Sequence, residues 1–345
     1  MSYNELRKDY LLDRWVVIAT ERSRRPTDFA KPKTSAASNC VCPMCVGNEN
    51  MTPPATLVYL KNGDRVVRKQ DSPDGERLKN WLIRCVPNLY PAFKPPKQPT
   101  DREKIFFSDN FGSAVGHHEV IVETPKHNES PADMPLSQLE LLINAYVSRL
   151  RELSVKSYVK HVSIFRNHGI EAGASLSHAH SQIIATPMIP TTVQEELAAS
   201  KTFHIANGKC VFCDIMEQEK RGPRVVLENK HFFVFAPYAS INPMEFWILP
   251  KRHSSNLSLK PVEKKAFALT LKTCLKALKE LLNDPPYNYG FHLALDSLNS
   301  KSYHWHLEVY PKLATWAGFE KSTGVFINTV TPETAAESLR QQIKS

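Results

Sequence analysis

Apolar and polar positions recur with two different periods along this chain. In residues 139–153 and 267–282 the apolar side chains return at every third or fourth position, which is the spacing of one face of an α-helix. Short runs rich in Val, Ile and Phe predict β-strands at 15–19, 161–167, 181–186, 232–236, 289–295 and 305–310. Further strands are predicted to lead into His127 and His253, and the chain from Pro332 onward predicts a short helix.

The predicted elements follow the same order in both halves of the chain. In each half, a strand that leads into a histidine is followed by an amphipathic helix and then by two strands. Because helices and strands do not alternate regularly, the pattern favours an α+β fold, with a mostly antiparallel sheet and flanking helices, over a doubly wound one. The sequence thus predicts a duplicated unit with halves at residues 1–195 and 196–345. The weak point between them is predicted near residues 188–209, where Pro187, Pro190 and Asn207-Gly208 interrupt the pattern.

Metal-ligand residues are repeated along with the elements. Each half has a Cys-x-x-Cys pair followed by two histidines, and both pairs of histidines are 51 residues apart. Structural zinc takes four cysteine or histidine ligands in a tetrahedron. We therefore predict two structural zinc ions per chain, one held by Cys42, Cys45, His127 and His178 and the other by Cys210, Cys213, His253 and His304.

Another histidine, His180 or His306, follows the last ligand of each half by two residues. Residues i and i+2 of a strand share a face, so His180 and Gln182 are predicted to face a common pocket. A neutral imidazole is a good nucleophile toward phosphorus, and the glycine- and serine-containing segment 167–177 suits contacts with phosphate oxygens. The second copy has Glu308 instead, which would repel phosphate, and its approach at 296–302 lacks glycine, so that copy is predicted to be structural.

Composition and charge narrow the class of protein. The chain is 42% hydrophobic with a net charge of +9, its N-terminus is too charged for a signal peptide, and no apolar run is long enough to span a membrane. We therefore expect a soluble cytoplasmic protein without a membrane partner. The densest basic run, Arg22-Ser23-Arg24-Arg25, suits a phosphate site. No zinc-finger spacing or aromatic–basic interleaving favours nucleic acid, and a two-zinc binding module is kept as the alternative to an enzyme.

Taken together, these motifs resemble the galactose-1-phosphate uridylyltransferase family, the transferase branch of the histidine-triad superfamily. The motifs that carry the resemblance are Arg22 to Pro26, Cys42-x-x-Cys45, Asn88 to Pro91, Asn167 to Gln182, and Gly318 to Glu320. The resemblance implies a duplicated histidine-triad fold, a homodimer, and a nucleophilic His180 that takes a nucleoside monophosphate from a nucleotide sugar. Gln182 stands where the hydrolase relatives have a histidine, which favours transfer over hydrolysis.

The resemblance also assigns contacts to the substrate. Phosphate would be contacted by Arg22, Ser23, Arg24 and Arg25, and the nucleoside by Met51, Thr52, Pro53 and Asn88. The α-phosphate would be held by Asn167, Gly173, Ala174, Ser175, Leu176 and Gln182, and the hexose or leaving group by Gly318, Phe319 and Glu320.

Two departures from the uridylyltransferase pattern bear on the substrate. Leu89 stands where an aspartate is typical, and no glutamine follows Glu320 closely. Both departures are similar to the plant-type ADP-glucose phosphorylases of this family, which implies that ADP-glucose and phosphate react to give ADP and glucose 1-phosphate. The alternatives are a UDP-glucose–hexose-1-phosphate uridylyltransferase and a dinucleoside polyphosphate phosphorylase, and the preference for adenine rests on the resemblance alone.

Overall fold

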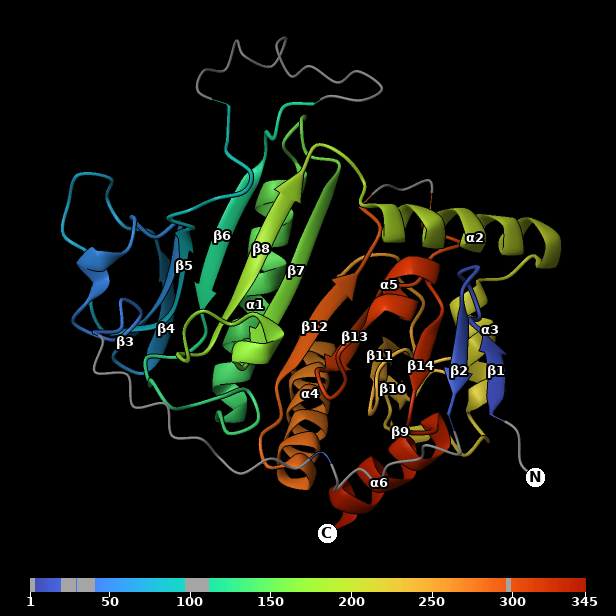
Figure 1. The fold of residues 1–345 in the computed structure, drawn as a ribbon. Coiled ribbons are helices and arrows are strands. Elements are labelled where there is room, and N and C mark those ends of the chain that lie inside the picture. Colours follow the sequence, from blue (N-terminus) through green and yellow to red (C-terminus); the bar gives the residue numbers. More distant parts are fainter. Residues whose placement is uncertain (1–3, 20–28, 30–40, 97–111, 296–298) are drawn as a thin grey trace. The chain divides into compact units, whose positions relative to one another are not determined.

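A computed structural model describes residues 4–19, 29, 41–96, 112–295 and 299–345 of the chain (Figure 1). The predicted phosphate contacts Arg22, Ser23, Arg24 and Arg25 lie outside these residues, as do residues 296–298 of the second half. The chain divides into two compact units, and the bounds of each include residues that the structure does not describe. The β8 unit comprises Ser38–Arg166 and Ser175–Pro190, and the β13 unit comprises Met1–Ala37, Asn167–Ala174 and Thr191–Ser345. The division at residue 195 stays a prediction.

An antiparallel sheet forms the centre of the β8 unit, with the strand order β4-β3-β5-β6-β8-β7. Helix α1 (Leu136–Ser154) packs against β5 and β8, and its buried stripe includes the predicted apolar residues. The strands and the short helix of this unit are β3 (Leu57–Asn62), β4 (Arg65–Lys69), β5 (Trp81–Pro87), β6 (His117–Val122), β8 (His180–Thr186), η3 (Glu49–Met51) and β7 (His161–His168), the last as far as Arg166.

The β13 unit contains a sheet of order β12-β13-β11-β10-β9 and a smaller sheet, β1-β2-β14, in which β2 and β14 are parallel. Its strands are β1 (Glu5–Lys8), β2 (Trp15–Ile18), β9 (Val225–Glu228), β10 (Phe232–Phe235), β11 (Phe246–Pro250), β12 (Tyr287–His292), β13 (His306–Pro311) and β14 (Phe326–Asn328). Its helices are η5 (Ile170–Ala172), α2 (Thr191–Asn207), α3 (Val211–Glu219), α4 (Pro261–Leu282), α5 (Gly318–Thr323) and α6 (Pro332–Lys344).

The two larger sheets repeat the same arrangement of strands. The order β5-β6-β8-β7 in one matches β10-β11-β13-β12 in the other, and helices α1 and α4 stand at the same place in each sequence of elements. The predicted α+β fold, with a duplicated unit and a mostly antiparallel sheet, is therefore confirmed. In both units the strand that carries the His-x-His motif is paired on both of its edges.

The segment 188–209, which the sequence marked as the weak point between the halves, contains helix α2. The residues that α2 buries are Val193, Glu196, Leu197 and Ser200. Their spacing is helical, but two of the four are polar, so apolar periodicity does not reveal the helix. Smaller differences affect strand ends: β12 begins at Tyr287 rather than at residue 289, and β8 already includes His180.

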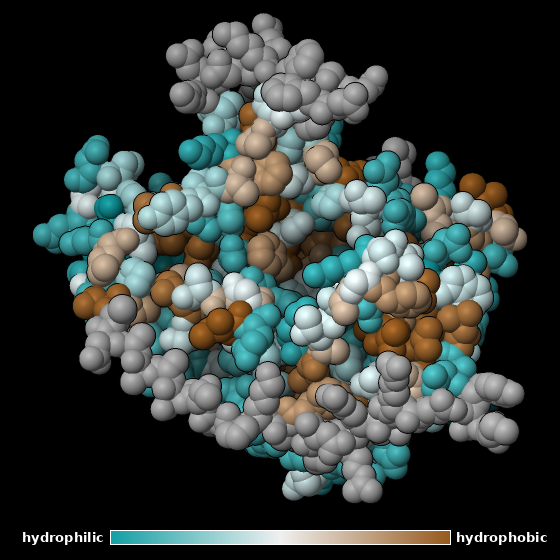
Figure 2. Space-filling view, viewed as in Figure 1, coloured by the Kyte–Doolittle hydropathy of each residue, from teal (hydrophilic) through white to brown (hydrophobic). Residues whose placement is uncertain are grey.

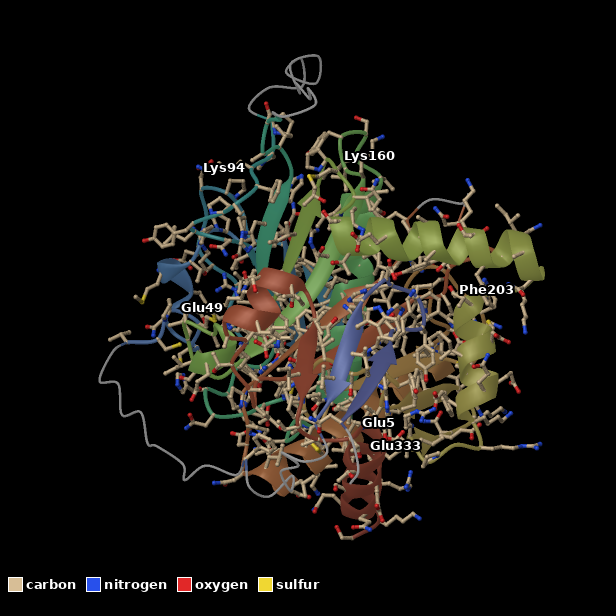
Figure 3. All side chains as sticks on the ribbon, turned by 45° about the vertical axis from the view of Figure 1, so that its right-hand side comes forward. Glu5, Glu49, Lys94, Lys160, Phe203 and Glu333 are labelled. Carbon is tan, nitrogen blue, oxygen red and sulfur yellow. The ribbon has the colours of Figure 1, made fainter. Side chains whose placement is uncertain are left out.

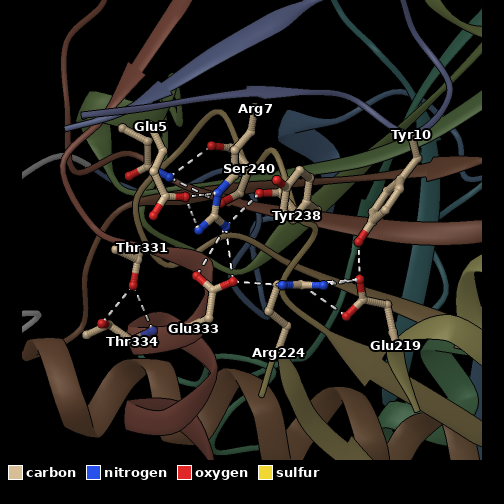
Figure 4. A network of polar contacts seen from close by, with 11 residues as sticks. Glu5, Arg7, Tyr10, Glu219, Arg224, Tyr238, Ser240, Thr331, Glu333 and Thr334 are labelled. Atoms are coloured by element: carbon tan, nitrogen blue, oxygen red, sulfur yellow. Dashed lines mark hydrogen bonds and ion pairs between the residues drawn. The ribbon is translucent and has the colours of Figure 1, made fainter. Parts of the chain in front are cut away.

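Charged residues connect the N-terminal hairpin of the β13 unit to its C-terminal helix. Figure 3 labels Glu5 on β1 and Glu333 on α6, which lie close together, and Arg7 contacts both carboxylates at 2.7 and 3.0 Å. Arg224 also reaches Glu333, at 2.7 Å, and the two guanidinium groups lie over the Tyr238 ring (Figure 4). This network joins strand β1, helix α6 and the residue that precedes strand β9, and it thereby stabilises the β13 unit.

Hydrophilic and hydrophobic side chains are interspersed on the face shown in Figure 2, as is usual for a protein surface. Among the described helices, none has the length and apolar character needed to cross a membrane.

Candidate functional site

In the β8 unit the four predicted ligands of the first metal site come together. Their ligand atoms lie within 4.8 Å of one another. Cys45 Sγ is 3.2 Å from His127 Nδ1 and 3.6 Å from His178 Nδ1, close to the roughly 3.5 Å expected between ligands of a tetrahedral zinc. The other ring nitrogens are held from behind, because His178 Nε2 donates to Thr124 O at 2.8 Å and His127 Nε2 lies 3.1 Å from Ser177 Oγ. The contact with Thr124 O directs the Nδ1 lone pair of His178 at the thiols, which fits a zinc ion.

The β13 unit gathers the second predicted set in the same way. Cys213 Sγ lies 3.4 Å from His253 Nδ1 and 3.5 Å from His304 Nδ1, and all four ligand atoms are again within 4.8 Å. A hydrogen bond from Cys213 lowers the pKa of Cys210, so that this thiol is held as a thiolate. His253 Nε2 donates to Ser300 O at 2.8 Å, which again directs Nδ1 to the cluster. The donor set of this site also fits zinc.

His180 begins strand β8 directly after the first metal cluster, and only 6% of its surface is exposed. Its Nδ1 lies 2.8 Å from His178 O, a carbonyl oxygen that can only accept a hydrogen bond. Nδ1 therefore carries the ring proton, and Nε2 keeps its lone pair. Burial lowers the pKa of His180, which maintains the neutral form at physiological pH. Among the described residues, no hydrogen-bond partner occupies Nε2, so the imidazole is prepared as a nucleophile.

Gln182 lies two residues further along β8, on the same face as His180. Its Oε1 is 2.7 Å from Nε2 of His118 on the neighbouring strand β6. Asn88, which follows β5, places its Nδ2 atom 3.1 Å from the same His118 nitrogen, and its Oδ1 accepts from Tyr90 N–H. The structure thus brings the predicted residues Gln182 and Asn88 together around a histidine that the sequence did not single out.

At the corresponding place in the β13 unit, the nucleophile position is occupied differently. His306 Nδ1 lies 3.1 Å from His304 O, just as His180 Nδ1 lies near His178 O, but His306 Nε2 is 3.0 Å from Glu308 Oε1. The His306 ring is fully buried and stacks on Trp247 and His292, with centroid distances of 5.1 and 4.8 Å. A nitrogen engaged by a carboxylate and covered by rings is not available to a substrate.

Glu308 and His306 belong to a further group of potential metal ligands. Their ligand atoms and those of Glu196 and His292 lie within 4.8 Å of one another. Burial alone would lower the pKa of His292, but Glu196 and Glu308 outweigh it and raise that pKa to about 9. Burial likewise opposes ionisation of Glu308, yet the pKa of this carboxyl falls to about 2 beside the histidines. Glu196 and Glu308 thus lie, largely buried, beside a histidine of opposite charge, His292.

The remaining predicted contact residues fall into both units. In the β8 unit, Met51 is exposed on η3, Thr52 and Pro53 follow it, and Thr52 Oγ1 accepts from Arg84 at 3.2 Å. Ser175 and Leu176 lie on the segment that leads to the first metal cluster.

In the β13 unit, Asn167 Oδ1 accepts from Asn288, which also donates to Ala172 O, and this pair of hydrogen bonds shapes the loop that contains Gly173 and Ala174. Gly173 has a φ of 87°, a conformation that residues with side chains rarely adopt. The predicted residues Gly318, Phe319 and Glu320 form the first turn of α5.

Sequence reasoning missed His118, Glu196 and His292. His118 lies in β6, the strand that was predicted to lead into His127, and nothing in that pattern distinguishes its side chain. His292 is the register partner of His306 across the pair β12–β13, a signal that becomes available only once the register is known. Glu196 lies on the helix that apolar periodicity did not reveal.

Comparison with known proteins covers nearly the whole chain. The profile of galactose-1-phosphate uridyl transferase, N-terminal domain, matches residues 83–190, and that of the C-terminal domain matches residues 161–342. The ADP-glucose phosphorylase of Arabidopsis thaliana is 34% identical over 98% of this chain and 92% of its own length. The galactose-1-phosphate uridylyltransferase of Thermotoga maritima is 33% identical over 98% of both chains.

Solved structures agree with the sequence matches. The crystal structure of an ADP-glucose phosphorylase from Arabidopsis thaliana with bound ADP-glucose covers 99% of both chains, with a TM-score of 0.80 and 32% identity. The fold and these relatives define a nucleotidyltransferase. The chain belongs to the galactose-1-phosphate uridylyltransferase family.

Proposed function

We propose that this enzyme transfers a nucleotidyl group from a nucleotide sugar through an adduct on His180, and that its reaction is ADP-glucose plus phosphate to ADP plus glucose 1-phosphate. The observation that carries the proposal is the geometry of His180, whose Nδ1 proton is held by His178 O at 2.8 Å while its Nε2 keeps the lone pair. The choice of substrate is supported by the similarity to the Arabidopsis thaliana ADP-glucose phosphorylase and its complex with ADP-glucose.

The reaction proceeds in two displacements at the α-phosphorus. His180 Nε2 attacks, the bond from the α-phosphorus to the bridging oxygen breaks, and glucose 1-phosphate leaves with that oxygen. An oxygen of inorganic phosphate then attacks the same phosphorus, the nitrogen–phosphorus bond breaks, and ADP leaves while His180 returns to its neutral form. Two displacements replace one that is harder, and they imply ping-pong kinetics.

Gln182 contributes hydrogen-bond donors to the phosphoryl oxygens, whose negative charge is not neutralised by His180 itself. An amide gives this stabilisation without being able to take up or release a proton. It therefore does not activate water as a base or acid, and the adduct persists until an acceptor phosphate arrives. Asn88 and Ser175 of the same unit are proposed to hold the nucleotide beside it.

We further propose two zinc ions per chain, held by Cys42, Cys45, His127 and His178 in one unit and by Cys210, Cys213, His253 and His304 in the other. With four protein ligands each, these ions would clamp the segments that precede the His-x-His strands and would leave no open position for a substrate. A homodimer and a cytoplasmic location stay predictions from the sequence.

The test is a panel of nucleotide sugars, each incubated with and without phosphate. ADP-glucose with phosphate is expected to give ADP and glucose 1-phosphate faster than UDP-glucose exchanges with galactose 1-phosphate. Radiolabel in the nucleoside should remain on the protein when phosphate is left out. An enzyme that forms no labelled adduct with any member of the panel would refute the proposal.

The second candidate is a UDP-glucose–hexose-1-phosphate uridylyltransferase. It is favoured by the 33% identity to the Thermotoga maritima enzyme, which nearly equals the identity to the phosphorylase. Faster uridylyl exchange than phosphorolysis in the same panel would decide for this candidate, while leaving the role of His180 intact.

A further inference from the structure

His118 determines how Gln182 presents its amide group. This histidine lies on strand β6, and its side chain is partly buried between the segment that follows β5 and strand β8. Three contacts surround it: Ala92 N at 3.1 Å from Nδ1, Gln182 Oε1 at 2.7 Å from Nε2, and Asn88 Nδ2 at 3.1 Å from Nε2. The contacts with Ala92 and Gln182 are satisfied together by one ring tautomer only, in which Asn88 Nδ2 faces a protonated nitrogen and makes no hydrogen bond with it.

The backbone N–H of Ala92 can only donate, so Nδ1 of His118 must accept. A neutral imidazole has one protonated nitrogen, and the proton of His118 therefore lies on Nε2. The acceptor for that proton is Gln182 Oε1, because Asn88 offers an amide nitrogen and its own oxygen already accepts from Tyr90 N–H. The reverse tautomer would point Nδ1–H at Ala92 N–H, donor against donor.

Strand geometry keeps His118 in place. Gly116, two residues earlier, packs so closely on β8 that an added Cβ would collide with the carbonyl of Ala185. His118 O also accepts from Asn88 N–H at 2.8 Å, which fastens the segment after β5 to β6. The side chain is thus positioned by backbone contacts on both sides.

We propose that His118 is a positioning residue for nucleotidyl transfer: it fixes the Gln182 oxygen as acceptor, so that the Gln182 amide nitrogen presents both of its hydrogens to the phosphoryl oxygens beside His180. The proposal rests on the adduct chemistry of the proposed function. Without the His118 donor, the amide rotates freely and presents its oxygen as readily as its nitrogen. An oxygen facing a phosphate repels it, so transition-state stabilisation falls.

Two substitutions separate this role from simple packing. His118→Phe keeps a planar ring without a donor, whereas the amide nitrogen of His118→Gln lies near the position of Nε2 and restores the donor. We expect His118→Phe to lower kcat by about 10- to 100-fold with KM within about twofold, since it loses an oriented transition-state donor. His118→Gln should stay within about fivefold of the wild-type kcat. Equal losses in both variants would overturn the proposal.

A double-mutant cycle tests whether His118 acts through Gln182. If it does, His118→Phe should cost less than about twofold in a Gln182→Ala background, because the group that it orients is already absent. Independent losses that multiply in the double variant would show that His118 has another role. Metal content, measured for each variant, controls for misfolding of the neighbouring cluster.

A measurement without turnover keeps this proposal distinct from the proposed function. ¹⁵N NMR of histidine-labelled wild-type protein, with the His118 signals assigned by their loss in His118→Gln, reports which ring nitrogen carries the proton. We expect a protonated Nε2 and an unprotonated Nδ1 in His118, whether or not ADP-glucose is the substrate. The opposite tautomer would overturn the inference, whereas the correct tautomer in a protein that forms no adduct would refute the proposed function alone.

Discussion

The His-x-His strands of the two units share their backbone geometry but differ in one neighbour. In each, the second histidine donates its Nδ1 proton to the carbonyl of the first, at 2.8 Å for His180 and 3.1 Å for His306. Two residues further on, one strand has Gln182 and the other has Glu308. The glutamine turns its oxygen to His118, whereas the glutamate turns a carboxylate to the histidine nitrogen itself, at 3.0 Å.

This difference separates what the fold supplies from what chemistry requires. The fold supplies a histidine with a fixed ring orientation, and it supplies it twice. A nucleophile additionally requires an Nε2 lone pair that no anion holds and a neighbour that attracts phosphate. Among the described residues, no anion contacts His180 Nε2, and we propose that Gln182 is the neighbour that attracts phosphate. In the β13 unit, the corresponding residues His306 and Glu308 instead contact Glu196 and His292 inside the unit.

The sharpest test of this comparison replaces the two histidines in parallel. His180→Asn keeps a polar side chain of similar reach but removes the nucleophilic nitrogen, so turnover should fall at least about 10³-fold and the labelled adduct should disappear. His306→Asn should retain turnover within about threefold when assayed where the protein is folded, although loss of its buried hydrogen bonds should lower stability by about 1–3 kcal/mol. An adduct mapped to His306 would reverse the assignment of the two halves.

Exchanging the neighbours tests the role of the amide directly. Gln182→Glu gives the β8 strand the residue of the β13 strand, and a carboxylate there should repel the phosphate and hold a proton on His180. We expect kcat to fall about 10²- to 10³-fold while both metals are retained, the magnitude of losing a preorganised donor. The reciprocal Glu308→Gln should not produce an adduct on His306, because that ring has no exposed surface. If Gln182→Glu turned over at close to the wild-type rate, the difference between Gln182 and Glu308 would not explain why one half is active and the other is not.

Removing one cysteine ligand from each proposed zinc site compares the contributions of the two sites. Cys42→Ser and Cys213→Ser should each lower the zinc content by about one ion per chain, because serine is a poor zinc ligand. Cys42→Ser should also lower adduct formation about 10- to 100-fold, since His178, whose carbonyl orients His180, belongs to the affected cluster. Cys213→Ser should lower the thermal midpoint with a smaller effect on the adduct. Elemental analysis that finds no metal in freshly purified wild-type protein would contradict both expectations.

The sequence predicts those features that leave a periodic or repeated pattern along the chain, and it does not predict those that depend on contacts between strands. Helices α1 and α4 bury apolar stripes with helical spacing, and the ligand sets are marked by two Cys-x-x-Cys pairs, so both features were predicted and both are found assembled. Helix α2 was missed because its buried face includes Glu196. The role of His118 depends on which strand pairs with β6 and on a contact from Ala92, and neither is visible in the spacing of residues along the chain.

The smallest expected effect concerns a stabilising network that lies wholly in the β13 unit. Burial opposes ionisation of Glu333, but hydrogen bonds from Arg224 and Arg7 outweigh it and lower the pKa of this carboxyl below its usual 4.5. A depressed folded-state pKa contributes stability that is present above the unfolded value and is lost as the pH falls through the folded one. The stabilisation by Glu333 should therefore be complete at neutral pH and decline below about pH 4.5.

Glu333→Gln removes the charge that Arg7 and Arg224 share, although each retains another carboxylate, Glu5 and Glu219. Because those partners remain, we expect a loss of only about 1 kcal/mol at pH 7, seen as a thermal midpoint about 2–4 °C lower, which shrinks as the pH is lowered below 4.5. Glu337→Gln, an exposed change on the same helix α6, is the matched control and should leave the midpoint unchanged. Adduct formation on His180 should be unaffected by either variant at pH 7. If Glu333→Gln instead slowed the adduct tenfold while remaining folded, the β13 unit would contribute to the chemistry as well as to stability, and the separation between the two halves would have to be abandoned.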